Sequence, residues 1–88
     1  MIETTVRVVN RAGLHTRPAA MLVKTASQFK SEVFLERDGF QINAKSIIGV
    51  MTLAAEQGSE LNMTVEGEDE ETAAKAIAEM FASGFEEQ

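Results

Sequence analysis

The chain has 88 residues, a formal net charge of −6 and no cysteine. This length predicts one small domain over residues 1–88. Such a domain is near the lower size limit at which a hydrophobic core is stable without disulfides or a structural metal. The lack of cysteine excludes disulfides and thiolate metal sites, and with only one histidine we expect no metal or other cofactor. The acidic charge argues against nucleic-acid binding. The chain also lacks a signal sequence and a long apolar run, so we expect a cytoplasmic protein without membrane insertion.

The chain opens with a pattern typical of a strand followed by a helix. Apolar and polar residues alternate over residues 2–9, as in a half-buried strand. From residue 16 to about residue 27 the apolar spacing becomes helical, with one face made by Ala19, Leu22, Val23 and Ala26. Ala20, Met21 and Lys24 lie off this face. We therefore consider them candidates for a surface that meets a partner.

A hairpin and a short helix are expected next. Residues 32–37 and 40–43 flank the pair Asp38-Gly39, which favours a two-residue hairpin turn. Ser46 is well placed as the N-cap of a helix that ends near residue 55.

The buried side of this short helix is predicted to hold Val50, Leu53 and Ala54. A helix of two or three turns buries only one stripe, so Ile47, Ile48 and Met51 should leave apolar surface for a partner. The alternative is a helix buried more deeply than usual.

The last two elements complete the predicted fold. Residues 60–66 alternate as a fourth strand, Asp69 is expected to cap a final helix, and Gly84 should end it. The order β-α-β-β-α-β-α predicts an α+β protein, an open-faced β-sandwich in which a four-stranded antiparallel sheet has three helices on one face.

Charge is unevenly distributed along the sequence. The lysines and arginines lie almost entirely before Ser46, and Lys75 is the only basic residue after it. We therefore expect the half that contains His15 to attract acidic partners. The terminal acids Glu86 and Glu87 are interpreted as solvated surface.

Residues 13–18 contain the only histidine and the only proline of the chain. Pro18 suits the first turn of a helix and Gly13 lets the preceding loop bend sharply, which places His15 at a helix N-terminus. Free N–H groups, the helix dipole and the Arg17 guanidinium would converge there, so the pattern predicts a phosphate site. The same positive field should keep the imidazole neutral, with a ring nitrogen free to attack phosphorus. The alternative is a surface or capping histidine without chemistry.

Two segments carry a family resemblance that extends over the whole chain. Gly13-Leu14-His15-Thr16-Arg17-Pro18-Ala19 resembles the active-site signature of the histidine-containing phosphocarrier (HPr) family of the bacterial phosphoenolpyruvate-dependent sugar phosphotransferase system. Residues 45–51, Lys-Ser-Ile-Ile-Gly-Val-Met, resemble its regulatory serine segment. The resemblance implies that His15 accepts a phosphoryl group through Nδ1, with Thr16, Arg17 and Pro18 in the phosphate-binding turn. Enzyme I would be the donor and enzyme IIA domains the acceptors.

The resemblance also implies partner surfaces and a regulatory site. Ser46 would be modified by an HPr kinase/phosphorylase, with a transcriptional regulator as a further partner. Ala12 stands where several relatives have a polar residue near the phosphate. The docking surface, as implied by the family, consists of Thr16, Arg17, Ala20, Met21, Lys24, Ile47, Ile48 and Met51.

Three functions follow from these observations. The first is a monomeric phosphoryl carrier, a substrate of other enzymes rather than an enzyme. The second is an interaction module controlled by Ser46, acting in catabolite or nitrogen regulation. The third, a small phosphate hydrolase, is disfavoured because the sequence offers no second acid or base near His15.

Overall fold

Alternating apolar and polar residues build a four-stranded antiparallel sheet in the order β1-β4-β2-β3. The computed structural model describes residues 1–87. Its elements follow the predicted order and class, which confirms the open-faced α+β fold. Their bounds are β1 (Ile2–Arg7), α1 (Thr16–Ala26), β2 (Glu32–Arg37), β3 (Phe40–Asn43), α2 (Ile47–Thr52), β4 (Glu60–Glu66), α3 (Glu70–Ala82) and a 3₁₀ turn (Gly84–Glu86).

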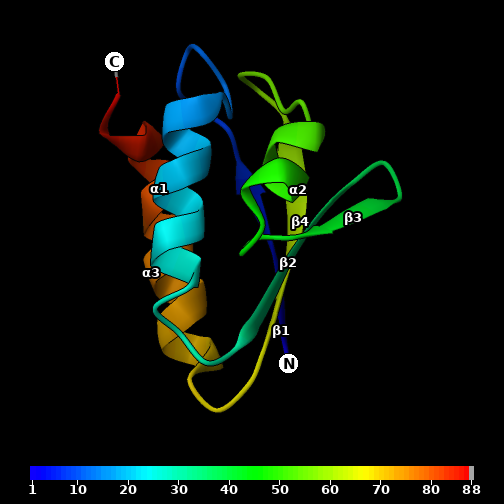
Figure 1. Cartoon of the computed structure of the whole chain (residues 1–88), viewed down its shortest axis with the longest axis vertical. Coiled ribbons are helices and arrows are strands. Elements are labelled where there is room, and N and C mark those ends of the chain that lie inside the picture. Colours follow the sequence, from blue (N-terminus) through cyan, green and yellow to red (C-terminus); the bar gives the residue numbers. More distant parts are fainter. Residues whose placement is uncertain (88) are drawn as a thin grey trace.

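The helices cover one face of the sheet, with α1 and α3 side by side and the shorter α2 beside α1 (Figure 1). β4 lies between β1 and β2, so its inward side chains Leu61, Met63 and Val65 are fully buried, as the alternation predicts. The other face of the sheet is not covered by helices. The hydrophobic core therefore lies in a single layer between sheet and helices.

The first strand ends two residues earlier than the alternation suggests. β1 stops at Arg7, yet Val8 is fully buried and its backbone exchanges hydrogen bonds with Ser59 and Gly58. Residues 8 and 9 therefore continue toward the site without pairing as a regular strand.

The short helix also ends earlier than expected, and one predicted buried residue is wrong. α2 stops at Thr52, and Ala54 has a left-handed backbone with φ of 49°. Since the chain has left the helix by then, Ala54 is exposed and Ala55 is buried in its place. Val50 and Leu53 are buried as predicted.

Asp69 occupies the predicted N-cap position of α3, but its carboxylate does not cap that helix. It accepts hydrogen bonds from the backbone N–H groups of Lys30 and Ser31, both at 2.9 Å, and from the Ser31 hydroxyl. The N–H of Gly67 is bound by the Glu70 carboxylate at 3.0 Å. Asp69 thus ties the start of α3 to the connection between α1 and β2.

The chain turns back after α3 instead of running on. Gly84 and Phe85 both have positive φ angles, 66° and 56°. The Phe85 ring is buried and meets Phe81 edge to face, with ring centroids 5.0 Å apart, which holds this non-glycine residue in a conformation it rarely adopts. As a result, the C-terminal end lies at the same end of the molecule as the loop between β1 and α1 (Figure 1).

Residues 1–87 contain neither a membrane-spanning helix nor a cluster of metal-ligating side chains. None of their helices is long and apolar enough to span a bilayer. No group of three or more His, Cys, Asp or Glu side chains in this range is arranged to hold a metal ion.

The contacts of Asp69 make stability depend on pH. The Ser31 hydroxyl, followed by the Lys30 N–H, lowers the pKa of Asp69 below its ordinary value of 3.8. The stabilisation is therefore complete above the unfolded-state pKa and is lost as pH falls through the lower folded-state pKa. We expect Asp69→Asn to lower the free energy of unfolding near neutral pH, and this difference to shrink in strong acid.

Urea denaturation of both proteins from about pH 7 down to about pH 2 measures this difference. Glu71→Gln is the matched control, since Glu71 is an exposed acid in the first turn of the same helix. If Asp69→Asn and Glu71→Gln had the same small effect at neutral pH, the proposed link between α3 and Ser31 would not contribute to stability.

Candidate functional site

The loop before α1 is fixed to the body of the protein by its backbone. The N–H of Leu14 donates to the carbonyl of Ala55 at 2.9 Å, and the Leu14 side chain is buried. Gly13 has φ of 74°, and a Cβ at this position would lie 2.6 Å from the same Ala55 oxygen. Asn10, itself buried, donates from Nδ2 to the Gly13 carbonyl at 2.8 Å. The sharp bend therefore requires glycine and determines where α1 begins.

His15 is the N-cap residue of α1, as predicted. Its backbone is extended, with φ of −81° and ψ of −167°, and its carbonyl accepts the first helical hydrogen bond from Ala19 at 2.9 Å. The imidazole makes no capping hydrogen bond, and the His15 side chain is 43% exposed. The ring is therefore positioned by the backbone and remains accessible to a partner.

The first turn of α1 has free hydrogen-bond donors. Within residues 1–87 the N–H groups of Thr16 and Arg17 have no acceptor, and Pro18 has no N–H. Arg17 is exposed and forms no ion pair in this part of the chain, whereas Arg7 pairs with Glu60 at 2.6 Å. This turn can therefore bind an anion through backbone N–H groups and one free guanidinium.

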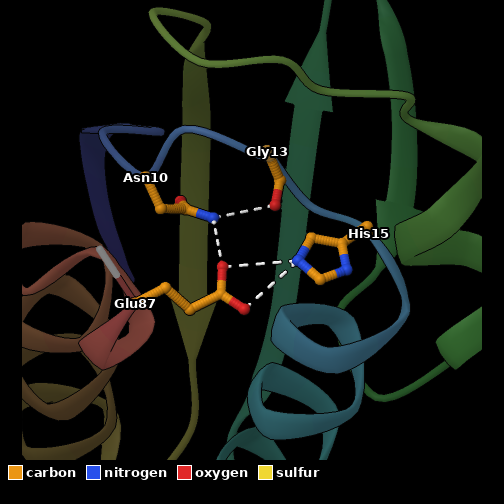
Figure 2. A network of polar contacts seen from close by, with 4 residues as sticks. All are labelled: Asn10, Gly13, His15 and Glu87. Carbon is orange, nitrogen blue, oxygen red and sulfur yellow. Dashed lines mark hydrogen bonds and ion pairs between the residues drawn. The ribbon is translucent and has the colours of Figure 1, made fainter.

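The structure brings an unexpected carboxylate to His15. Glu87 Oε2 lies 3.2 Å from His15 Nε2, and Oε1 lies 3.3 Å from the same nitrogen. Oε1 also accepts a hydrogen bond from Asn10 Nδ2 at 3.1 Å. Figure 2 shows this network, in which Glu87 approaches one ring nitrogen and the other nitrogen points away from it.

Two expectations about the acids are therefore wrong. Glu87 is not solvated surface, because its side chain is only 14% exposed and contacts His15; Glu86 is exposed as expected. His15 also has an acidic neighbour, although the sequence indicated none. The expectation of a neutral ring considered positive groups alone, and Glu87 adds a negative charge that this argument left out. No local signal could have found this contact, since 72 residues separate the two side chains.

The start of α2 holds the second group of predicted site residues, Ser46 and the exposed apolar residues that follow it. Ser46 is exposed and caps the helix as predicted, its Oγ accepting from the Gly49 N–H at 3.1 Å. Ile47, Ile48 and Met51 are 40%, 75% and 43% exposed, so the helix is not deeply buried and the predicted apolar surplus is confirmed.

α1 packs against α2, so the exposed residues of α1 that the sequence singled out are considered together with those of α2. Ala20 and Lys24 are exposed and Met21 is half-buried. We call these three residues, together with Ile47, Ile48 and Met51, the α1–α2 surface. Its role in docking stays a prediction.

Comparison with known proteins identifies the family. A family model described as "PTS HPr component phosphorylation site" matches residues 2–83. The chain belongs to the HPr family. The phosphocarrier protein HPr of Treponema pallidum (strain Nichols) is 54% identical over 88 residues, covering 100% of both chains. The crystal structure of HPr from Thermoanaerobacter tengcongensis aligns with a TM-score of 0.96 at 45% identity, covering 100% of this chain and 99% of that chain.

A third relative is a dimer in its crystal structure. Crh, the Bacillus subtilis catabolite repression protein, forms a domain-swapped dimer in its crystal structure. It is 43% identical to this chain, with a TM-score of 0.77 and coverage of 96% of this chain and 97% of that chain. This chain belongs to the HPr phosphocarrier family of the phosphotransferase system. Its monomeric state stays a prediction.

The geometry at Gly13 gives a testable consequence for folding of the site. We expect Gly13→Ala to lower the free energy of unfolding by about 3 kcal/mol, because the new Cβ combines a left-handed backbone with a clash against Ala55. Gly39→Ala is the control, since Gly39 also has a positive φ but has nothing within 4 Å of the added Cβ. That variant should lose only about 1 kcal/mol. Equal losses in urea denaturation would contradict the close approach at Ala55.

Proposed function

We propose that this HPr-family chain carries a phosphoryl group covalently on His15 Nδ1, receiving it from Enzyme I and passing it to enzyme IIA domains. The observation that supports this most directly is the arrangement of the imidazole. One ring nitrogen faces Glu87, and the ring stands at the start of α1 beside N–H groups that have no acceptor among residues 1–87.

The chemistry of this site suits reversible transfer. The lone pair of Nδ1 forms a bond to phosphorus while the bond from phosphorus to the donor's leaving atom breaks. The phosphoryl oxygens would be bound by the N–H groups of Thr16 and Arg17, by the Arg17 guanidinium and by the positive end of the α1 dipole. Because the ring is 43% exposed, two different partners can reach the same phosphorus in turn.

The α1–α2 surface would provide the docking area for both partners. Its apolar members offer area to bury, its methionines can adapt to more than one partner, and Lys24 adds positive charge. Docking over His15 would also exclude water, which limits hydrolysis of the phosphohistidine.

The acidic neighbour of His15 does not favour a hydrolase. Glu87 approaches Nε2, whereas the phosphoryl group would be on the other ring nitrogen, which points away from Glu87 (Figure 2). A general base for hydrolysis would have to hold a water close to phosphorus. The position of Glu87 therefore supports a carrier, which depends on slow hydrolysis.

The proposal is tested by labelling with Enzyme I and phosphoenolpyruvate. The purified protein should gain one acid-labile phosphoryl group, and His15→Ala should gain none because the nucleophile is removed. Ser46→Ala is the control and should be labelled like the original chain. Labelling of His15→Ala, or no labelling of the folded original chain by an Enzyme I that labels another HPr, would contradict the proposal.

A second proposal concerns Ser46, which we infer to be a regulatory phosphorylation site for an ATP-dependent HPr kinase/phosphorylase. Two observations favour it: the hydroxyl is exposed at the N-terminus of α2, and Ile47, next in sequence, belongs to the α1–α2 surface. A phosphate there would gain from the helix N-terminus but would place a dianion beside the docking area. It would weaken docking of an acidic donor and could create a site for a transcriptional regulator.

Ser46→Asp tests this electrostatic effect without a kinase. We expect the second-order rate of phosphoryl transfer from Enzyme I to fall several-fold, because a negative charge is added beside the docking area. Ser46→Asn is the matched control, since it keeps a capping oxygen for Gly49 without the charge. Raising the salt concentration should reduce the difference. Equal rates for the two variants at low salt would contradict the inference.

A further inference from the structure

A continuous polar network joins the loop, the histidine and the C-terminal segment. The Gly13 carbonyl accepts from Asn10 Nδ2 at 2.8 Å, the same nitrogen donates to Glu87 Oε1 at 3.1 Å, and the Glu87 carboxylate reaches His15 Nε2 at 3.2 Å. Figure 2 shows that Asn10, Gly13 and His15 belong to the loop before α1 and that Glu87 reaches them from the C-terminal segment. The bond from Asn10 to Gly13 is local, whereas both contacts of Glu87 depend on the tertiary structure.

The orientation of the Asn10 amide is set by chemistry. Its nitrogen faces two oxygen acceptors, the Gly13 carbonyl and the Glu87 carboxylate. The opposite orientation would place an amide oxygen against both acceptors, where it could not donate. Asn10 Oδ1 is buried without a partner in the described part of the chain, a cost that the two donated bonds offset. Asn10 is therefore fixed as a donor to Glu87.

We propose that Glu87 is a positioning residue that holds the His15 proton on Nε2 and so keeps the Nδ1 lone pair available for phosphorus. A carboxylate can only accept, so the ring nitrogen that faces it must be the donor. The proposal rests on the proposed function only in assigning phosphoryl transfer to Nδ1. The tautomer itself is a property of the unphosphorylated chain.

The same contact has a consequence for the transfer step. When the Nδ1 lone pair forms the bond to phosphorus, the bond to the donor's leaving atom breaks and its electron pair stays with the donor. The ring keeps its Nε2 proton and becomes positively charged. Glu87 faces this charge at Nε2, as the aspartate of a catalytic triad faces its imidazolium. Because a protonated ring is also a better leaving group, the contact should support transfer in both directions.

Glu87 is held in place more firmly than an ordinary surface acid. Its side chain is 14% exposed, and the preceding turn is anchored by the buried ring of Phe85 against Phe81. Glu86, next to it in sequence, is exposed and makes no side-chain hydrogen bond or ion pair within residues 1–87. The two neighbouring acids thus provide a natural comparison.

The experiment compares Glu87→Gln with Glu86→Gln, which remove the same charge from adjacent positions. Nitrogen NMR of the unphosphorylated protein with a neutral His15 ring should show Nδ1 without a proton in the original chain and in Glu86→Gln. In Glu87→Gln a glutamine can donate as well as accept, so we expect a larger share of the tautomer with the proton on Nδ1. Transfer from phosphorylated Enzyme I to Glu87→Gln should be about 10-fold slower, as expected for the loss of one charge-assisted hydrogen bond.

The outcomes separate this inference from the proposed function. If Glu87→Gln matched Glu86→Gln in both tautomer and rate, the positioning role would be wrong while the carrier function stood. If the original chain were never phosphorylated, the carrier function would fail, and the tautomer measurement would still decide the role of Glu87. A normal tautomer with a slow rate in Glu87→Gln would also overturn the proposal, because the defect would then not act through the ring.

Discussion

The close approach of the Gly13 turn to the backbone of Ala55 is the constraint on which the site depends. It forces a left-handed glycine at the end of the loop, and the next residue, Leu14, is buried and bonded to the same carbonyl. The chain can then begin α1 only at one position, which makes His15 the N-cap residue. The placement of the imidazole is therefore a consequence of core packing, although the ring itself is exposed.

The site combines donors that point outward with a carboxylate that lies partly buried behind the ring. Free N–H groups at the start of α1 and the Arg17 guanidinium favour an anion. Glu87 approaches the ring through its other nitrogen and is held by Asn10. Opposite charges thus act on different atoms of the same imidazole. In the proposed transfer, this separation would let the site attract a phosphoryl group and also stabilise the positive ring that forms.

The two candidate regions are connected through one contact between helices. α1 begins at the histidine and packs against α2, which begins at Ser46. A small domain with one layer of helices has little room to separate a transfer site from a regulatory one. A partner that docked on the α1–α2 surface, as proposed, would contact both helices, and a charge at Ser46 would then affect transfer directly.

The sequence by itself determined most of this arrangement, because its signals are local. Alternation specified the strands, the Asp38-Gly39 pair specified the hairpin, and the position of Ser46 specified the N-cap of α2. The motif around His15 was sufficient for both the helix start and the family. Each of these features depends on residues a few positions apart, so periodicity and turn chemistry reveal them.

Only the tertiary structure decided the features that join distant segments. Asp69 was predicted to cap α3 but binds Ser31 instead. Ala55 is buried where Ala54 was expected to be, and Glu87 lies beside His15. The neighbouring residues in the sequence do not reveal whether a carboxylate is solvated or paired. Its partner depends on which distant segment the folded chain brings next to it. For Glu87 this placement depends on the buried Phe85 ring and a left-handed backbone, which no local pattern in the sequence indicates.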